Sequence, residues 1–537
     1  MATAVAGKRK REDNPTTPST AKRPAVNQKA NGSVAKARKN VAVPQPKVDV
    51  PVRTKDSEAA PAPKTSSKTK PTSTEAVAPA KAIEGDIHLQ LVTGSYERVL
   101  HGVAATIPRN LLQATDSPSE DATKDTAVTF SDTFLFAAHA SAVRCLAISP
   151  ATESDKRYLA TGSSDERINV YSISSAPPTN DQRVDLPTLA SSATVVNPRN
   201  RSLGSLIHHD RAITRLEFPA KGKLFSAAED NTIAISRTRD WTVLSSIKAP
   251  IPKPQGRPSG DTAGPGEVPA GVNDFAIHPS QKLMLSVSRG ERCLRLWNLM
   301  TGKKAGVLNF DRSLLTQVGE SKYNSGEGRS VLWNTSGEAY VVGFERGAAV
   351  FGVDSKPQAL IRPTPNTKLH QFRMVPAVTG SEDGELLAVS TEDGRILIFR
   401  TSTDAVADGK EKLPLCSCVA QLGGPGAGIS GRIKDFEIVD VQVDEAPAPP
   451  VRLVVTASSD GAVRVWNMKE QLMGVEEGED LPKQVGSLIA TLETGSRITC
   501  LGAFLLDGKA EGVTADEDDA DFGAMEDAAS SGGEEEV

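Results

Sequence analysis

Apolar residues recur along this 537-residue chain in a fixed triplet, at positions i, i+3 and i+5. One of the copies is degenerate, with glycine at its first position. In chain order the copies are Val143/Leu146/Ile148, Ile213/Leu216/Phe218, Val272/Phe275/Ile277, Gly328/Val331/Trp333, Leu369/Phe372/Met374, Ile433/Phe436/Ile438 and Ile498/Leu501/Ala503. A pattern that returns at intervals of several tens of residues predicts an architecture of stacked repeats.

A second pattern consists of a small-residue strand end, a turn, and an alternating apolar strand that closes on an aromatic residue. Three copies lead from a turn aspartate to the aromatic residue: Asp165 to Tyr171, Asp393 to Phe399, and Asp460 to Trp466. The equivalent closing positions in the other copies are His101, Ser236, Trp297 and Phe351. Because Asp-Gly pairs favour tight hairpins, as at Asp460-Gly461, we expect each unit to be a small antiparallel sheet.

The order of the two patterns predicts a closed ring. The first closing strand, around Val99 to His101, has no triplet before it, and the last triplet, at Ile498, has no closing strand after it. Each end of the repeat region supplies what the other lacks. If the last strand docks beside the first strands, seven four-stranded sheets close without a free edge between the ends. We therefore predict an all-β, seven-bladed β-propeller over residues 86–506, closed by its C-terminal strand.

The closing positions lie further apart than the about 40–45 residues of a minimal blade, so the blades carry insertions. Proline and glycine in these segments cannot continue a central strand, and we expect loops that protrude from the ring and offer binding surfaces. The segments are 108–128, 174–204, 250–269, 402–430, 446–450 and 469–485.

The histidines and aspartates near the turns have a structural explanation. A turn aspartate, a preceding serine and a histidine from an earlier loop can hydrogen-bond to the closing aromatic residue and so fix the blade. We expect this stabilising role, rather than catalysis or metal binding, for a set spread over five blades: His139, Asp165, Tyr171, His209 (or its neighbour His208), Asp230, Trp297, Asp393, Phe399, Asp460 and Trp466.

The first 85 residues form a basic head. They hold 17 Lys and Arg against 7 Asp and Glu and contain no aromatic residue. Such a composition predicts disorder. Two basic clusters on a flexible spacer, Lys8-Arg9-Lys10-Arg11 and Lys22-Arg23, have the form of a bipartite nuclear-import signal. The alternative is a solvated charge run that adheres to polyanions such as RNA.

Residues 507–537 form an acidic tail, with 12 Asp and Glu against one Lys. Charge repulsion and the lack of apolar anchors predict disorder here too. A basic head and an acidic tail on one chain are frequent in proteins that handle ribosomal or chromatin components. The alternative for the tail is a simple gain in solubility.

The sequence argues against several other classes of protein. No apolar stretch approaches the 18 residues of a membrane span, and the charged start is unlike a secretory signal, which predicts a soluble, non-secreted protein. The five cysteines are scattered, so we expect reduced thiols and no zinc site. Phosphate-loop, His-Glu-x-x-His and Gly-x-Ser-x-Gly motifs are absent. We expect no enzyme activity, no cofactor, no metal and no small-molecule substrate.

The repeat region resembles the WD-repeat family, in which the blade ends on Trp-Asp. That ending survives as Trp297-Asn298 and Trp466-Asn467 and decays elsewhere, for example to Tyr171-Ser172. Further segments resemble, in order, a nucleolar branch of this family, the maintenance-of-killer or p21-activated-kinase-interacting proteins. These segments are 91–100, His208-His209, 226–230, 277–280, 294–299, 455–461 and 497–502.

The resemblance implies a non-catalytic adaptor in nucleolar assembly and maturation of the large ribosomal subunit, in pre-rRNA processing particles. Its implied partners are assembly factors and ribosomal proteins of the large-subunit precursor, with rRNA contact through the basic head and no membrane. The implied location is the nucleus and nucleolus. Two alternatives stay open: a negative regulator that binds a p21-activated protein kinase, and a chromatin-associated WD-repeat adaptor.

Overall fold

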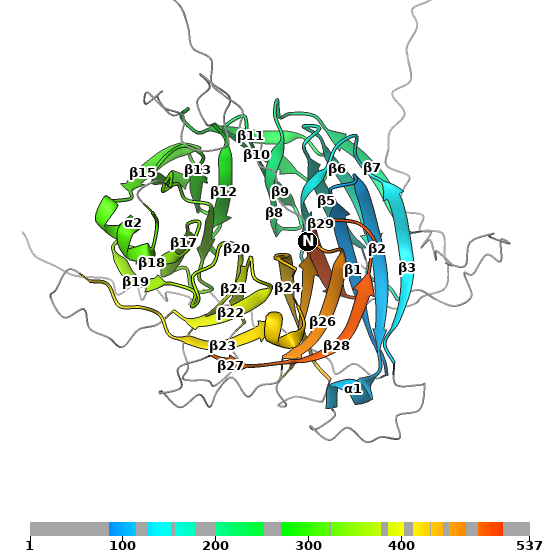
Figure 1. Ribbon diagram of the computed structural model, residues 1–537. Helices are drawn as coiled ribbons and strands as arrows, with labels where there is room; N and C mark the ends of the chain where they lie inside the picture. The colour runs from blue at the N-terminus through cyan, green and yellow to red at the C-terminus, as the bar shows by residue number, and fades with distance from the viewer. Residues whose placement is uncertain are drawn as a thin grey trace, which may run out of the picture. The chain divides into compact units, whose positions relative to one another are not determined.

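The computed structural model describes residues 85–113, 127–151, 156–177, 199–251, 270–321, 324–376, 385–401, 412–429, 431–443, 450–468 and 482–507. The predicted basic head and acidic tail, with the import residues Lys8 to Arg11, Lys22 and Arg23, lie outside these ranges apart from Gly85 and Asp507. The described part of the chain is a seven-bladed β-propeller, as the repeats predict (Figure 1).

Each blade has four antiparallel strands, which follow one another from the centre of the ring outward. We number the blades by their innermost strands, with β29 in blade 1. The innermost strands are β29 (Ile498–Leu505), β4 (Val143–Ile148), β8 (Ile213–Ala220), β12 (Val272–Ile277), β16 (Ser330–Trp333), β20 (Leu369–Val375) and β24 (Ile433–Val441). The second strands are β1 (Ile87–Ser95), β5 (Lys156–Ser163), β9 (Lys223–Ala228), β13 (Leu283–Ser288), β17 (Ala339–Gly343), β21 (Leu386–Thr391) and β25 (Val451–Ser458).

Each third strand contains one of the predicted closing positions. They are β2 (Val99–Ile107), β6 (Ile168–Ser174), β10 (Thr232–Arg237), β14 (Cys293–Asn298), β18 (Ala348–Gly352), β22 (Arg395–Arg400) and β26 (Ala462–Met468). The outer strands are β3 (Thr129–Ala137), β7 (Arg201–Leu206), β11 (Val243–Lys248), β15 (Lys303–Asn309), β19 (Pro357–Ile361), β23 (Cys418–Gly423) and β28 (Ser487–Glu493).

The two ends of the ring meet in blade 1. Strand β1 pairs with β2 on one side and with β29 on the other, with Leu91 opposite both Val103 and Ala503. The C-terminal strand β29 thus docks beside β1 and completes blade 1. Blade 1 is built from residues about 400 positions apart in the sequence, so closing it joins the first and last repeats.

The core lies between neighbouring blades. Alternate residues of each strand face the next sheet, and between blades 7 and 1 this buries Leu89, Leu91, Val455 and Val465 completely or almost so. Apolar alternation in the second and third strands thus supplies both faces of every inter-blade layer.

Several segments predicted as loops contain regular structure. Residues 402–430 include β23 and a 3-10 turn, η3 (Pro425–Ala427). Segment 469–485 ends in β27 (Lys483–Gln484), which pairs in parallel with β23. Helix α1 (Arg109–Gln113) lies in segment 108–128. Helix α2 (Arg312–Val318) lies outside the segments predicted as loops and buries Leu314, Leu315 and Val318 between blades 4 and 5. The outer strand β7 likewise falls partly inside the predicted loop 174–204.

Candidate functional site

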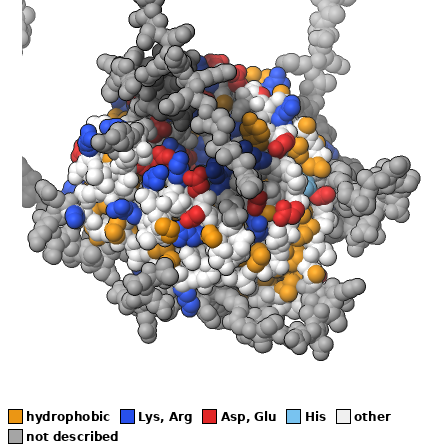
Figure 2. Space-filling view, in the orientation of Figure 1, with side chains coloured by type: hydrophobic (Ala, Val, Ile, Leu, Met, Phe, Trp, Pro, Cys, Tyr) orange, Lys and Arg blue, Asp and Glu red, His pale blue; other side chains and the backbone are white. Residues whose placement is uncertain are grey.

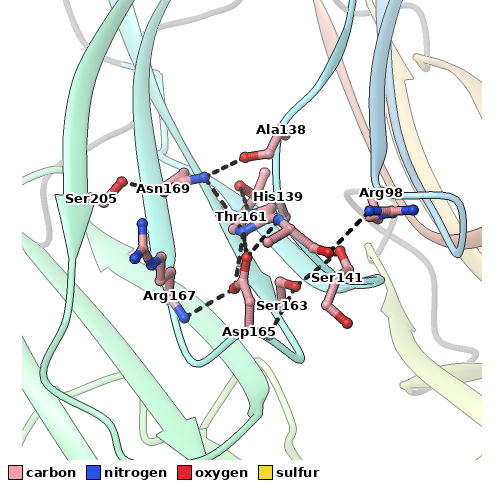
Figure 3. Close-up of polar contacts among 11 residues, drawn as sticks. Arg98, Ala138, His139, Ser141, Thr161, Ser163, Asp165, Arg167, Asn169 and Ser205 are labelled. Carbon is pink, nitrogen blue, oxygen red and sulfur yellow. Dashed lines mark hydrogen bonds and ion pairs between the residues drawn. The ribbon is translucent and has the colours of Figure 1, made fainter.

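In blade 2, the predicted residues His139 and Asp165 form one buried network with Thr161 (Figure 3). Nδ1 of His139 lies 3.1 Å from a carboxylate oxygen of Asp165, and Nε2 lies 2.8 Å from the Thr161 hydroxyl. Because a carboxylate only accepts, Nδ1 donates and Nε2 accepts. Burial lowers the pKa of His139, so the imidazole is neutral at pH 7. The side chain of His139 is 0% exposed, which leaves no access for a substrate.

Blade 3 repeats this network with His209 and Asp230. Nδ1 of His209 donates to Asp230 over 3.0 Å, and Nε2 accepts from the hydroxyl of Ser226 over 2.8 Å. Thr232 adds two further donors to the Asp230 carboxylate. Burial alone would raise the pKa of Asp230, but hydrogen bonds from His209 and Thr232 hold it at about 2. The neighbouring His208 lies 3.1 Å from the same Ser226 hydroxyl.

In blades 6 and 7 the turn aspartate pairs with an arginine, whereas in blades 2 and 3 it pairs with a histidine. In blade 6, Arg395 donates to Asp393 through two guanidinium nitrogens, at 3.0 and 2.6 Å. In blade 7, Arg464 reaches Asp460 at 3.4 Å, and the Ser458 hydroxyl also donates to that carboxylate. These arginines are site residues that the sequence patterns did not indicate.

The predicted closing residues lie at equivalent positions in the third strands of their blades. The indole N–H groups of Trp297 and Trp466 donate to hydroxyls of the second strand, Ser286 at 2.8 Å and Thr456 at 3.2 Å. Phe399 is buried in the apolar layer between blades 5 and 6. Tyr171 is partly buried, which raises the pKa of its hydroxyl, and its ring lies edge-on to Phe136. We propose that all ten predicted residues stabilise blades.

The inner strands surround the central channel that is typical of a propeller, and six of them carry a β-bulge at the same place. The register shifts directly after Val143, Ile213, Val272, Ile433 and Ile498, and near the start of β20. A bulge re-aims a side chain. The positions next to the first triplet residue form what we call the mouth ring: Arg144, Thr214, Asn273, Arg329, His370, Lys434 and Thr499. Every member is polar and none is acidic. Figure 2 shows Lys and Arg side chains beside Asp and Glu side chains near the centre of the face in view.

Deeper in the channel, acidic side chains and arginines of several blades lie close together. Arg373 contacts Asp435 at 3.3 Å and Glu437 at 2.9 Å, and Asp435 also accepts the backbone N–H of Leu501 in blade 1. Burial raises the pKa of Asp435 to about 6, although Arg373 opposes the shift. Burial likewise raises the pKa of Glu217 to about 7. These groups tie blades together and leave a channel wall of mixed charge.

At the mouth, glutamates of the loops that follow the second strands hold cations of neighbouring blades. Glu229 lies 2.8 Å from Arg144 and 3.1 Å from Arg289. The pKa of Glu229 is held low because the two guanidinium groups outweigh the effect of burial. The mouth is therefore a rigid polar surface, suited to recognising another macromolecule.

Within the described ranges, no group of three or more His, Cys, Asp or Glu side chains could hold a metal ion. No helix in this part of the chain is long and apolar enough to cross a membrane. The five cysteines are free, and burial raises the pKa of each thiol, to about 12 for Cys145 and Cys416.

Comparison with known proteins agrees with the fold. Residues 130–172 match the family model of the WD domain, G-beta repeat. This segment spans β3 of blade 1 and the three inner strands of blade 2, so the sequence repeat is offset from the structural blade by one strand. The offset is the reason why the ring must close with strands from both ends.

Relatives match across most of the propeller. A Gallus gallus protein called p21-activated protein kinase-interacting protein 1-like is 27% identical over 422 residues, covering 78% of this chain and 80% of the relative. Protein MAK11 of Saccharomyces cerevisiae is 26% identical, covering 74% of this chain and 83% of its own length. Shk1 kinase-binding protein 15 of Schizosaccharomyces pombe is 25% identical, covering 79% and 86%. The chain is a seven-bladed β-propeller with a match to the WD40 repeat, and it is similar over most of its length to the p21-activated protein kinase-interacting protein 1-like proteins and to MAK11.

Proposed function

We propose that the protein is a scaffold in nucleolar assembly and maturation of the large ribosomal subunit, where it binds assembly factors and ribosomal proteins of pre-rRNA processing particles. The observation that carries this proposal is the match to MAK11, which extends over 74% of the chain and is not confined to the repeat signature. The order of matching segments, from 91–100 to 497–502, supports the same branch of the WD-repeat family.

A closed propeller suits this role because its blades offer several separate surfaces on one rigid body. The mouth is polar and held by ion pairs. The outer strands carry exposed apolar residues, such as Leu135 and Phe136 on β3 and Leu203 on β7. The basic head would add phosphate-driven contact with rRNA, and its import signal would place the protein in the nucleus and nucleolus.

Affinity purification tests the proposal. The full-length protein, tagged at its C-terminus and recovered at low salt, is expected to bring down precursors of the large subunit with their rRNA. The matched control is a variant with Lys8 to Arg11, Lys22 and Arg23 changed to glutamine, which should stay folded but lose its nuclear location. Recovery of kinase complexes alone, or of chromatin alone, would contradict the proposal.

A second candidate is a regulator that binds a p21-activated protein kinase. Two relatives carry kinase interaction in their names, p21-activated protein kinase-interacting protein 1-like and Shk1 kinase-binding protein 15. The location of the protein separates the candidates. A cytoplasmic protein whose distribution does not change when the two basic clusters are neutralised would favour the kinase.

A further inference from the structure

One side of the channel mouth carries more cations than carboxylates. Five residues from blades 5, 6 and 7 make up this surface, which we call the crescent: Arg329, Lys368, His370, Arg432 and Lys434. Two glutamates face it. Glu345 contacts Lys368 at 3.0 Å and Arg329 at 3.5 Å, and Glu392 contacts Arg432 at 2.7 Å. Four permanent cations thus meet two carboxylates.

The excess positive charge is concentrated at Lys434, on the inner strand β24. Lys434 is partly buried and forms no ion pair within the described part of the chain. Burial, together with the nearby Arg432 and Arg497, lowers the pKa of the Lys434 ammonium, and Glu392 opposes the shift. The Nε2 atom of His370 is buried without a hydrogen-bond partner among the described residues. Burial and Lys434 lower the pKa of His370 to about 4, so its ring is neutral at pH 7.

Three of the equivalent positions in other blades are satisfied within the protein, whereas the buried hydroxyl of Thr214 in blade 3 has no hydrogen-bond partner among the described residues. Arg144 is paired with Glu229 at 2.8 Å. The amide of Asn273 donates to the backbone oxygen of Gly328 at 2.9 Å, and the Thr499 hydroxyl lies 2.7 Å from the backbone oxygen of Val143. The mouth ring therefore uses these members to join blades. The ammonium of Lys434, in contrast, has no ion-pair partner among the described residues and stays available to a ligand, whereas Nε2 of His370 is buried from solvent.

We propose that the crescent is a binding site for an acidic peptide segment of a partner protein, whose carboxylates accept hydrogen bonds from the ammonium of Lys434 at the channel mouth. A partly desolvated ammonium without a carboxylate partner of its own is suited to a carboxylate ligand. Binding would also relieve the repulsion among Lys434, Arg432 and Arg497. The proposal does not depend on the role in ribosome assembly.

The arrangement favours a peptide over RNA. Glu345 and Glu392 lie on the loops that border the crescent, so a phosphate backbone crossing the rim would meet carboxylates. The crescent has no Phe, Tyr or Trp side chain on which a base could stack, whereas proteins that bind single strands use such platforms. A short acidic segment can direct one or two carboxylates at Lys434 without contacting the rim.

Fluorescence anisotropy with a labelled Glu- and Asp-rich dodecapeptide tests the site. The full-length chain is compared with Lys434→Gln, Lys434→Arg and a control, Lys303→Gln, which removes one exposed cation from the outer strand β15. All four proteins carry the basic head, so its contribution cancels. We expect about tenfold weaker binding for Lys434→Gln, less than twofold change for Lys303→Gln, and near-normal binding for Lys434→Arg. Thermal melting checks that each variant is folded.

The acidic tail of the same chain can compete for the crescent, so the series is repeated on a chain ending at residue 510, which keeps every described strand. Tighter peptide binding by this shorter chain, with the same loss in Lys434→Gln, would support the site. Equal affinities for Lys434→Gln and Lys303→Gln in both lengths would overturn the proposal. It would also be overturned if single-stranded RNA displaced the peptide and bound more tightly with the same dependence on Lys434.

Discussion

The turn aspartate at the equivalent position is bound by a histidine in blades 2 and 3 and by an arginine in blades 6 and 7. In blades 2 and 3 a histidine from the preceding connection donates to Asp165 or Asp230, so the bond joins two segments that are distant in sequence. In blades 6 and 7 an arginine of the following strand donates, as Arg395 does to Asp393. The histidine therefore fixes the entry to the blade. Arg464 stabilises its own hairpin, whereas Arg395 also donates to the backbone oxygen of Thr364 in the preceding connection, at 3.0 Å.

The difference in burial has energetic consequences. The side chains of Asp165 and Asp230 are 10% exposed, against 28% for Asp393 and 41% for Asp460. Charged hydrogen bonds shielded from water are stronger, and exposed ion pairs contribute little. Blades 2 and 3 should therefore be more sensitive to loss of the aspartate.

The largest effect is expected for Asp230→Ala in blade 3. The change removes the acceptor of His209, of Thr232 and of the Asp210 backbone N–H. We expect the free energy of unfolding to fall by about 2–3 kcal/mol, because buried donors lose a charged partner. Denaturant titration measures it, with Asp230→Asn, which keeps one acceptor oxygen, as the milder control. A loss below that of Asp460→Ala would contradict the comparison.

The histidine blades should also be sensitive to acid. Burial, with the nearby His209, lowers the pKa of His208 to about 4 from an unfolded value near 6.5. The unfolded chain then binds the proton first, so stability is complete above pH 6.5 and falls as the pH decreases toward 4. The slope is at most about 1.4 kcal/mol per pH unit.

The acid effect is isolated by comparing the wild type with His208→Gln at pH 7 and pH 5. Glu217 and Asp435 have raised pKa values and act in the opposite sense, so only the difference between the two proteins reports on His208. We expect the free energy of unfolding to fall less for the variant than for the wild type when the pH decreases from 7 to 5. An identical change in both proteins would show that His208 does not titrate as described.

A moderate effect is expected for Trp297→Phe in blade 4. The variant keeps most of the ring but leaves the hydroxyl of Ser286, which is 0% exposed, without its indole donor. The expected loss is about 1–1.5 kcal/mol. Trp297→Phe with Ser286→Ala should recover part of it, and a double variant less stable than the single one would argue against the hydrogen bond.

The smallest effect is expected for Asp460→Ala in blade 7. The carboxylate is 41% exposed and its guanidinium partner lies 3.4 Å away. The variant also removes the acceptor of the Ser458 hydroxyl and of the Ala462 backbone N–H. Because water reaches this exposed side chain and can replace its partners, the loss should be at most about 1 kcal/mol. Differential scanning calorimetry gives the shift, and a loss as large as that of Asp230→Ala would remove the distinction between the two kinds of blade.

Most of the ring could be predicted because the third strands are buried on both faces and the inner strands repeat an apolar triplet, so both leave a regular pattern. The outer strands leave no such pattern. In β7, five of six residues are exposed, and β23 follows a segment rich in polar residues, so both fell within predicted loops. Edge strands of this kind are held by backbone pairing, which a pattern of side chains does not record.

The candidate site was predictable only in part. Histidine is rare in this chain, so His139 and His209 stand out, and the structure places each beside the expected aspartate. Arg395 and Arg464 occupy ordinary positions of an alternating strand, and nothing in the sequence distinguishes them. The mouth ring left a signal in the sequence, since the residue after the first position of every triplet is polar. The bulge that turns this residue toward the channel depends on the backbone and leaves no such signal.

Cross-linking mass spectrometry of the full-length protein, purified with its native complexes, tests the scaffold most directly. The account predicts cross-links from lysines of the propeller, including Lys368 and Lys434 at the mouth, to proteins of the large-subunit precursor. Cross-links that lead only to a protein kinase, with no ribosomal or assembly protein among the partners, would contradict it.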